Sequence, residues 1–120
     1  MIVAIPTPGK DLSSRVDSRF GRAVGFIIYN TGDASWKHKK NILDDLAHEG
    51  AGEQAANNLL KEKVDALVSG HCGPKAFEIF SSSGVKVYSK VSGPISQALE
   101  RLEAGELEEL ASADVQDHWS

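Results

Sequence analysis

Short apolar runs alternate with amphipathic stretches along most of this chain. Three apolar runs have the length of strands, Ile2–Ile5, Phe26–Tyr29 and Ala66–Val68, and Val85–Tyr88 is a further predicted strand. Three stretches carry apolar residues at helical spacing: Glu53–Lys63, the segment that begins at Pro74, and the segment that begins at Ser92–Pro94. The pattern therefore predicts an α/β domain in which helices connect most of the strands.

The second apolar run predicts a hairpin. The turn-forming residues Asn30–Asp33 follow it, and Ala34–Lys39 is then expected to return as the second arm. Trp36 is predicted to face inward on that arm. The lysines that follow Trp36 are typical of residues that protect an exposed sheet edge.

One structural unit occurs twice. The order strand, loop, Gly-Pro, helix, Gly runs through Val64–Gly84 and again through Val85–Gly105. Two such units in succession predict parallel strands with right-handed crossovers. Because Ile2–Ile5 is too apolar for an edge, it is expected beside the strand of the first unit. The prediction is a mixed five-stranded sheet, with the hairpin on one side of the first strand, the parallel strands on the other, and helices on both faces.

Length and composition limit the classes of protein. The 120 residues suit one domain, predicted over 1–105 and followed by an acidic tail over 106–120. The net charge of −4 argues against a nucleic-acid binder that works by bulk electrostatics. The single cysteine excludes an internal disulfide and fits a reducing compartment. With no apolar stretch of membrane length and no basic leader, a cytoplasmic protein without membrane partners is expected.

A ligand is expected at one edge of the sheet. Open α/β sheets bind ligands beyond the carboxyl ends of their parallel strands. Three segments are predicted there: Pro6–Gly25, Ser69–Gly73 and Ser89–Gly93. Helix N-termini at this edge favour anions, and the arginines of the first segment add positive charge. The start of the Glu53 helix is expected to reach the same edge.

The only cysteine of the chain, Cys72, lies beside His71 in the loop after Ala66–Val68. Thiolate and imidazole donors favour a soft or borderline metal, and Cys72 is expected to face an open cavity. The sequence has no C-x-x-C spacing, and one thiol cannot build a four-cysteine cluster. A metal cluster here must therefore use one or two protein donors or share ligands between subunits.

Each of these residues also has a simpler interpretation. Cys72 is then a small loop residue, His71 caps a carbonyl, and His48 is an exposed turn residue. The long first loop is then solvated, with Asp17 paired to one of its arginines. Nucleophilic catalysis by Cys72 with His71 is disfavoured, because residues adjacent in the chain rarely point at each other.

Several short motifs together resemble a known family. In chain order they are Val16–Ala23, Gly50–Gly52 with Gln54–Ala56, Val64–Asp65, Gly70–Phe77 and Gly84–Tyr88. From Met1 to about Gly105 the chain resembles the dinitrogenase iron–molybdenum cofactor biosynthesis family. The resemblance implies a ribonuclease H-like three-layer α/β fold without nuclease residues. It also implies non-covalent binding of an iron–sulfur or molybdenum–iron–sulfur cluster rather than catalysis, in cofactor assembly or a related role.

The hypothesis drawn from residues and resemblance together assigns roles to particular positions. The predicted metal ligands are Cys72, His71 and His48. The predicted cofactor-binding residues are Arg19, Arg22, Gly50, Gly52, Gly70 and Gly73. The expected partners are the metallocluster and the proteins that donate or accept it, with the chain a monomer or homodimer. The alternative is a regulatory module that binds a small anion or a protein partner, with Cys72 incidental.

Overall fold

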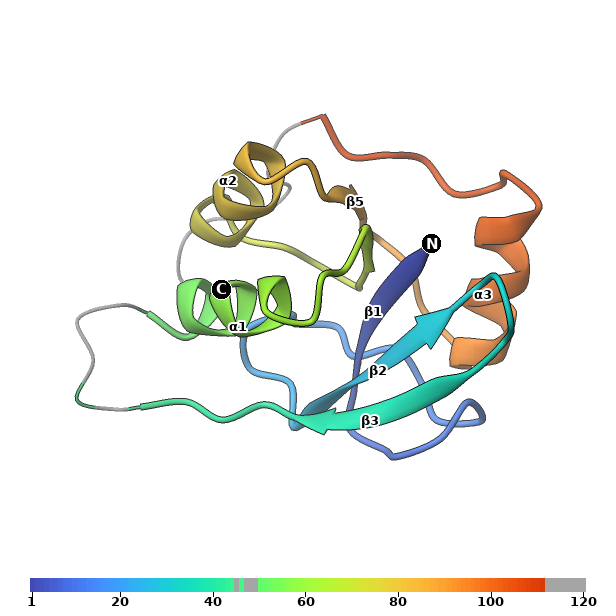
Figure 1. Ribbon diagram of the computed structural model, residues 1–120, viewed down its shortest axis with the longest axis horizontal. Helices are drawn as coiled ribbons and strands as arrows, with labels where there is room; N and C mark the ends of the chain where they lie inside the picture. Colours follow the sequence, from blue (N-terminus) through green and yellow to red (C-terminus); the bar gives the residue numbers. More distant parts are fainter. Residues whose placement is uncertain (45, 47–49, 112–120) are drawn as a thin grey trace.

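The chain folds into three layers around one sheet (Figure 1). The computed structural model describes residues 1–44, 46 and 50–111. The strands are β1 (Ile2–Thr7), β2 (Gly25–Asn30), β3 (Trp36–Lys40), β4 (Ala66–Val68) and β5 (Lys86–Tyr88). The helices are α1 (Ala51–Leu60), α2 (Pro74–Ser82) and α3 (Ile95–Glu103).

The sheet has the order β3-β2-β1-β4-β5. β2 pairs antiparallel with both β1 and β3, whereas β4 runs parallel to both β1 and β5. The predicted mixed sheet is therefore confirmed, with the hairpin and the two parallel strands on opposite sides of the first strand. β1 also includes Pro6, whose strand partner is Phe26. The carbonyl of Pro6 accepts a bond from the N–H of Asp17 in the following loop, at 2.7 Å.

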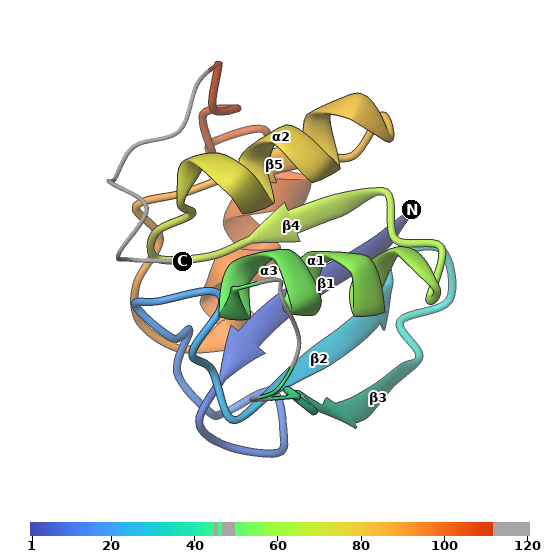
Figure 2. The same cartoon turned by 90° about the vertical axis from the view of Figure 1, so that its left-hand side faces the viewer.

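Both faces of the sheet are covered. α1 and α2 lie on one face and α3 on the other (Figure 2). β1 sends Ala4 into the core under α1 and α2, and Val3 and Ile5 into the core under α3. A strand buried on both faces reads as a continuous apolar run, which is the pattern at the start of this sequence. No helix of the described residues is long and apolar enough to cross a membrane.

The connection between β1 and β2 contributes to the core. Val16, Phe20 and Ala23 are buried, and Phe20 is completely inaccessible. The ring centroid of Phe20 lies 5.6 Å from that of Phe26 and 5.3 Å from that of Phe80. The alternative of a solvated loop is therefore wrong for this segment, because its aromatic residue joins β2 to α2.

Glycines end the second and third helices in the same way. Gly84 has φ of 76°, and its N–H donates to the carbonyl of Ser81, while the next N–H, of Val85, donates to Phe80. Gly105 closes α3 with the same pair of bonds and φ of 73°. Glycine suits this left-handed position because it has no Cβ to clash with the backbone. The repeated unit predicted from the sequence thus has matching helix ends.

The prediction that Trp36 faces inward is wrong. Its side chain is 42% exposed. Among the described residues β3 is the outermost strand and pairs only with β2. Trp36 therefore has a strand neighbour, Tyr29, on one side only.

The first part of the acidic tail is ordered along the opposite edge. Leu110 donates its N–H to the carbonyl of Val87 at 2.7 Å, and Glu109 forms an antiparallel bridge with Tyr88. This stretch therefore pairs with the open side of β5 and covers the sheet edge. His118 and Trp119 lie outside the described residues.

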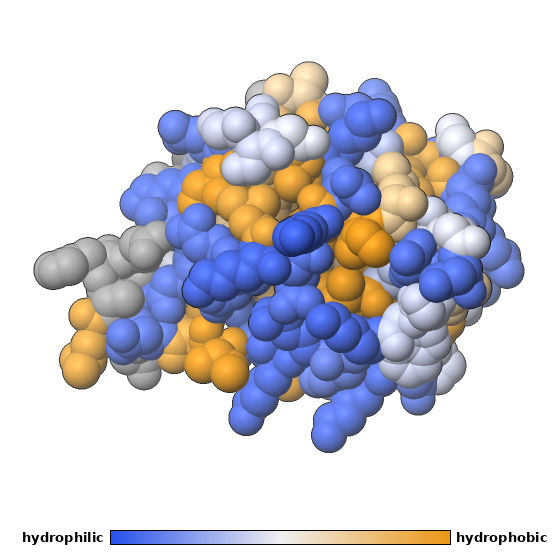
Figure 3. All heavy atoms as spheres, in the orientation of Figure 1, coloured by the Kyte–Doolittle hydropathy of each residue, from blue (hydrophilic) through white to orange (hydrophobic). Residues whose placement is uncertain are grey.

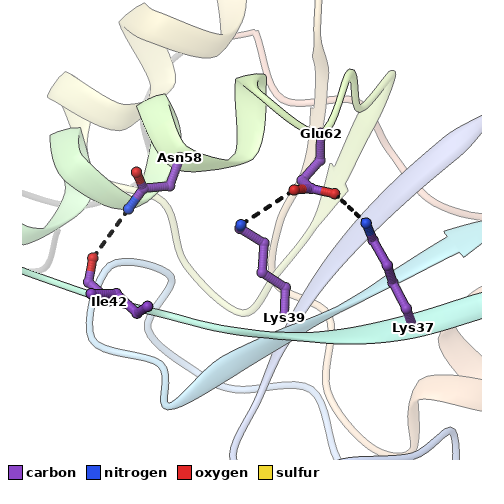
Figure 4. A network of polar contacts seen from close by, with 5 residues as sticks. All are labelled: Lys37, Lys39, Ile42, Asn58 and Glu62. Carbon is purple, nitrogen blue, oxygen red and sulfur yellow. Dashed lines mark hydrogen bonds and ion pairs between the residues drawn. The ribbon is translucent and has the colours of Figure 1, made fainter.

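A polar network fastens α1 to the hairpin (Figure 4). Glu62, just after α1, accepts contacts from Lys37 at 2.6 Å and from Lys39 at 3.2 Å. Asn58 donates to the carbonyl of Ile42 at 3.1 Å. The glutamate therefore neutralises two lysines that lie side by side on β3.

Replacing Glu62 by glutamine should lower the free energy of unfolding at neutral pH by about 0.5–1 kcal/mol. The hydrogen bond from Lys37, followed by that from Lys39, lowers the pKa of Glu62. A lowered folded-state pKa gives stability above the unfolded pKa and loses it as pH falls through the folded value. Urea denaturation should therefore show a difference at neutral pH that disappears in acid. The exposed Glu100 provides a matched control: Glu100→Gln should lower stability at neutral pH by less than Glu62→Gln does, and equal losses would contradict the assignment.

Candidate functional site

Three loops meet at the carboxyl ends of β1, β4 and β5. The N–H of Gly70, after β4, donates to the carbonyl of Asp17 at 3.1 Å. The carbonyl of Gly70 accepts from the N–H of Lys90, after β5, at 2.6 Å. The β4–α2 loop therefore lies between the other two, and the structure confirms that the three predicted segments share one edge.

Gly70 allows the first two loops to touch. A Cβ added at Gly70 would lie 2.5 Å from the Cα of Ser18 and 2.8 Å from the carbonyl oxygen of Asp17. Both atoms belong to the backbone, so neither can rotate away. The β1–β2 loop therefore fills the space on the side of Gly70 where a side chain would project.

The β1–β2 loop also occupies the start of α3. The N–H groups of Ile95 and Ser96 donate to the carbonyls of Ser14 and Leu12, at 2.9 and 3.0 Å. The expectation that helix N-termini at this edge offer free amides is therefore wrong for these two amides of α3. The bonds instead fix the position of the loop.

A pocket of about 530 Å³ opens where the loops meet. It is lined by Arg15, Val16, Ser18, Gly70, His71, Lys90, Val91, Ser92 and Gly93. Arg15 and Lys90 are exposed cations from different loops. His71 is half-buried and comes from the third loop, between β4 and α2. No carboxylate of the described residues lines the pocket. This charge pattern favours an anionic ligand.

Lys90 has an unusual backbone. Its φ is 61°, a left-handed conformation that is uncommon for a residue other than glycine. The short bond to Gly70 and the bond from the N–H of Val91 to the carbonyl of Ser69, at 3.2 Å, hold it there. Such conformations gather at ligand sites, where the surrounding structure maintains them.

The sequence analysis did not single out the two cations that line this pocket. Arg19 and Arg22 were the cations predicted to bind the cofactor, and neither lines the pocket, whereas the predicted Gly70 does. Arg19 is half-buried, and its backbone N–H donates to the Asp17 carboxylate at 3.1 Å. Arg22 is exposed outside the pocket lining. Lys90 could have been predicted from the sequence, because it is the cation of Ser89–Gly93, a segment expected at this edge.

Cys72 points into the core. Its side chain is 1% exposed, and it belongs to the apolar cluster under α1 and α2. Its Sγ lies 3.7 Å from the carbonyl oxygen of Gly73. The prediction that the thiol faces an open cavity is therefore wrong, because Cys72 packs in the apolar core while its neighbour His71 lines the pocket.

The remaining predicted positions lie away from the pocket lining. Gly50 is exposed and Gly52 is buried, both at the start of α1. Gly73 is buried at the N-terminal cap of α2. His48 lies outside the described residues. Within the described part of the chain, no group of three or more His, Cys, Asp or Glu side chains is placed to hold a metal ion.

Comparisons with known proteins agree with the resemblance drawn from the sequence. The model of the dinitrogenase iron–molybdenum cofactor family matches residues 1–105. The apo form of the orange protein from Desulfovibrio gigas is 31% identical, with a TM-score of 0.89 over 95% of this chain and 96% of that one.

Two further proteins are similar over most of their length. A Thermotoga protein, provisionally described as a NifB protein of the DUF35 family, is 37% identical, with a TM-score of 0.81 over 95% of this chain and 97% of its own. An uncharacterised protein of Methanocaldococcus jannaschii is 27% identical over 90% of each chain.

Proposed function

Because this chain belongs to the dinitrogenase iron–molybdenum cofactor family, we propose that it binds and carries an anionic metallocluster without catalysing a reaction on it. The cargo is an iron–sulfur or molybdenum–iron–sulfur cluster, and the proposed site is the pocket between the three loops. The observation that carries the proposal is that two cations from different loops, Arg15 and Lys90, line this pocket.

Charge supplies the main attraction in this proposal. Two opposite unit charges about 4 Å apart attract by about 4 kcal/mol at the effective dielectric of a protein surface. A cluster that touches both Arg15 and Lys90 gains two such interactions, reduced by salt and by solvent. The hydroxyls of Ser18 and Ser92, also in the lining, can donate hydrogen bonds to its outer atoms.

His71 is the proposed protein donor at the pocket. One imidazole cannot hold a bare metal ion, but a preassembled cluster already has most of its ligands. Cys72 and His48 are proposed as additional metal ligands; Cys72 does not line the pocket, and His48 lies outside the described residues. A bond to Cys72 requires the loop to turn its thiol out of the core, so Cys72→Ala should change retention of the cluster only if that rearrangement occurs.

The second candidate is that the pocket binds a smaller anion and that the protein is a regulatory module rather than a carrier. The same cation pair suits an oxyanion such as phosphate, and the buried thiol would then be incidental. Thermal unfolding in metal-free buffer with phosphates and nucleotides distinguishes the candidates. Stabilisation by phosphate alone would favour the regulatory module.

Anaerobic reconstitution with iron, sulfide and molybdate tests the carrier directly. After gel filtration, the wild type should retain metal, and the double variant Arg15→Gln/Lys90→Asn about tenfold less, because it lacks both cations. Asparagine is chosen because it tolerates the left-handed backbone at position 90. The matched control is Arg22→Gln/Lys86→Gln, which removes two exposed cations outside the pocket lining. Equal retention by the double variant, or none by the wild type, would contradict the proposal.

A further inference from the structure

The outer side of β3 is an open sheet edge. Within the described part of the chain β3 pairs with β2 alone. At its two ends the N–H of Asn41 donates to the carbonyl of Val24, just before β2, and the carbonyl of Ser35 accepts from the N–H of Asn30. In an antiparallel ladder the direction of the backbone groups alternates. The N–H and C=O groups of Trp36, His38 and Lys40 therefore point away from β2, where another strand could pair.

Positive charge concentrates along this edge. Five lysines lie on β3 or next to Glu62 in the chain, although the whole chain carries a net charge of −4. They come from β3 and from the end of α1: Lys37, Lys39, Lys40, Lys61 and Lys63. Glu62 contacts only the first two, and the side chain of Lys37 remains 63% exposed. We call these five lysines and Trp36 the β3 edge surface.

An apolar hollow adjoins the β3 edge surface. It measures about 290 Å³ and is lined by Ile2, Ile28, Asn30, Ser35, Trp36, Lys37 and Glu62. Figure 3 shows hydrophilic surface along the line of β3 and hydrophobic surface beside it, over the start of β1. The nearby carboxylates Asp33 and Asp65 already accept hydrogen bonds, from Ser35 and from the N–H of Ile2.

We propose that the β3 edge surface binds an acidic, extended segment of a partner protein, which adds to the sheet as a further strand beside β3. The backbone groups of Trp36, His38 and Lys40 pair with the segment, and the lysines attract its carboxylates. One apolar side chain of the segment enters the hollow beside Trp36. This binding is separate from the cargo pocket and does not depend on what that pocket holds.

A polypeptide suits this surface better than a nucleic acid. Nucleic acids offer no strand to pair with the open backbone, and the net charge of −4 opposes their approach. Lysines alone would protect an edge from pairing. An exposed tryptophan and an apolar hollow beside those lysines instead provide a place for a side chain, as in strand-addition complexes.

The test uses peptides of simple composition with the full-length protein. The probe is a short capped peptide of alternating glutamate and valine, and the controls are glutamate–glycine and lysine–valine peptides. The glutamate–valine peptide should bind, with affinity falling as salt rises. Amide exchange, followed by NMR, should slow at Trp36, His38 and Lys40 but not at Lys37 and Lys39, whose amides already face β2.

Charge reversal adds a second readout. Lys40→Glu/Lys61→Glu keeps both contacts of Glu62 and should weaken binding about tenfold or more. The matched control Lys10→Glu/Lys86→Glu changes two exposed lysines elsewhere and should weaken binding far less. The proposal is overturned if the glutamate–glycine peptide binds equally well, if the three amides gain no protection, or if a DNA duplex binds more tightly. Self-association through this edge without peptide would also overturn it.

Discussion

Replacing Phe20 by alanine should lower the free energy of unfolding by about 3–5 kcal/mol, the largest loss expected for any single loop substitution in this protein. The side chain is fully buried although it belongs to the β1–β2 connection. Its ring lies edge-on to Phe80 and tilted against Phe26, so truncation leaves a cavity between α2 and β2. Urea denaturation followed by circular dichroism measures the loss.

Phe77→Ala is the matched control for Phe20. Phe77 lies on α2 and is only half-buried at the margin of the same core. Its truncation should cost about 1–2 kcal/mol, since less apolar surface returns to water. If Phe20→Ala costs no more than Phe77→Ala, the loop does not contribute to the core as the structure indicates.

Replacing Gly70 by alanine should destabilise the fold by about 3 kcal/mol and loosen the pocket. The added methyl group meets the backbone of Ser18 and Asp17 at 2.5 to 2.8 Å, so one loop must move. The same residue bonds to Lys90, so the movement reaches the pocket wall. Denaturation measures the stability, and metal retention after reconstitution measures the pocket.

Gly50→Ala separates this contact from a general effect of removing a glycine. A Cβ at Gly50 meets no atom within 4 Å, and φ there is −71°, which any residue can adopt. Its substitution should change stability by no more than about 0.5 kcal/mol. Equal losses at the two positions would show that the contact between the loops is not the cause.

The arrangement of the sheet could be predicted because its signals are local. The repeat of strand, Gly-Pro and helix fixes the direction of β4 and β5, and the final glycines mark where α2 and α3 end. The continuous apolar run of β1 requires cover on both faces, which places it in the middle. Each of these signals needs only neighbouring residues.

The errors arose where long-range packing decides the outcome. The segment around Phe20 is polar in sequence, and only the positions of β2 and α2 reveal a cavity that one aromatic ring fills. The direction of Cys72 depends on how the chain turns after β4. Arg15 and Lys90 line one pocket because Gly70 bonds to both of their loops. No pattern within one loop contains that information.

The most direct test of the proposed carrier function is to locate the cargo on the protein. After anaerobic reconstitution with iron, sulfide and molybdate, amide NMR signals should shift or broaden at Ser18, His71 and Lys90. Signals of the β2–β3 turn, which lies beside Met1 at the opposite end of the strands, should stay unchanged. Changes centred on Cys72 and its core neighbours, with the loops around Arg15 and Lys90 unaffected, would contradict the proposal that this pocket holds the metallocluster.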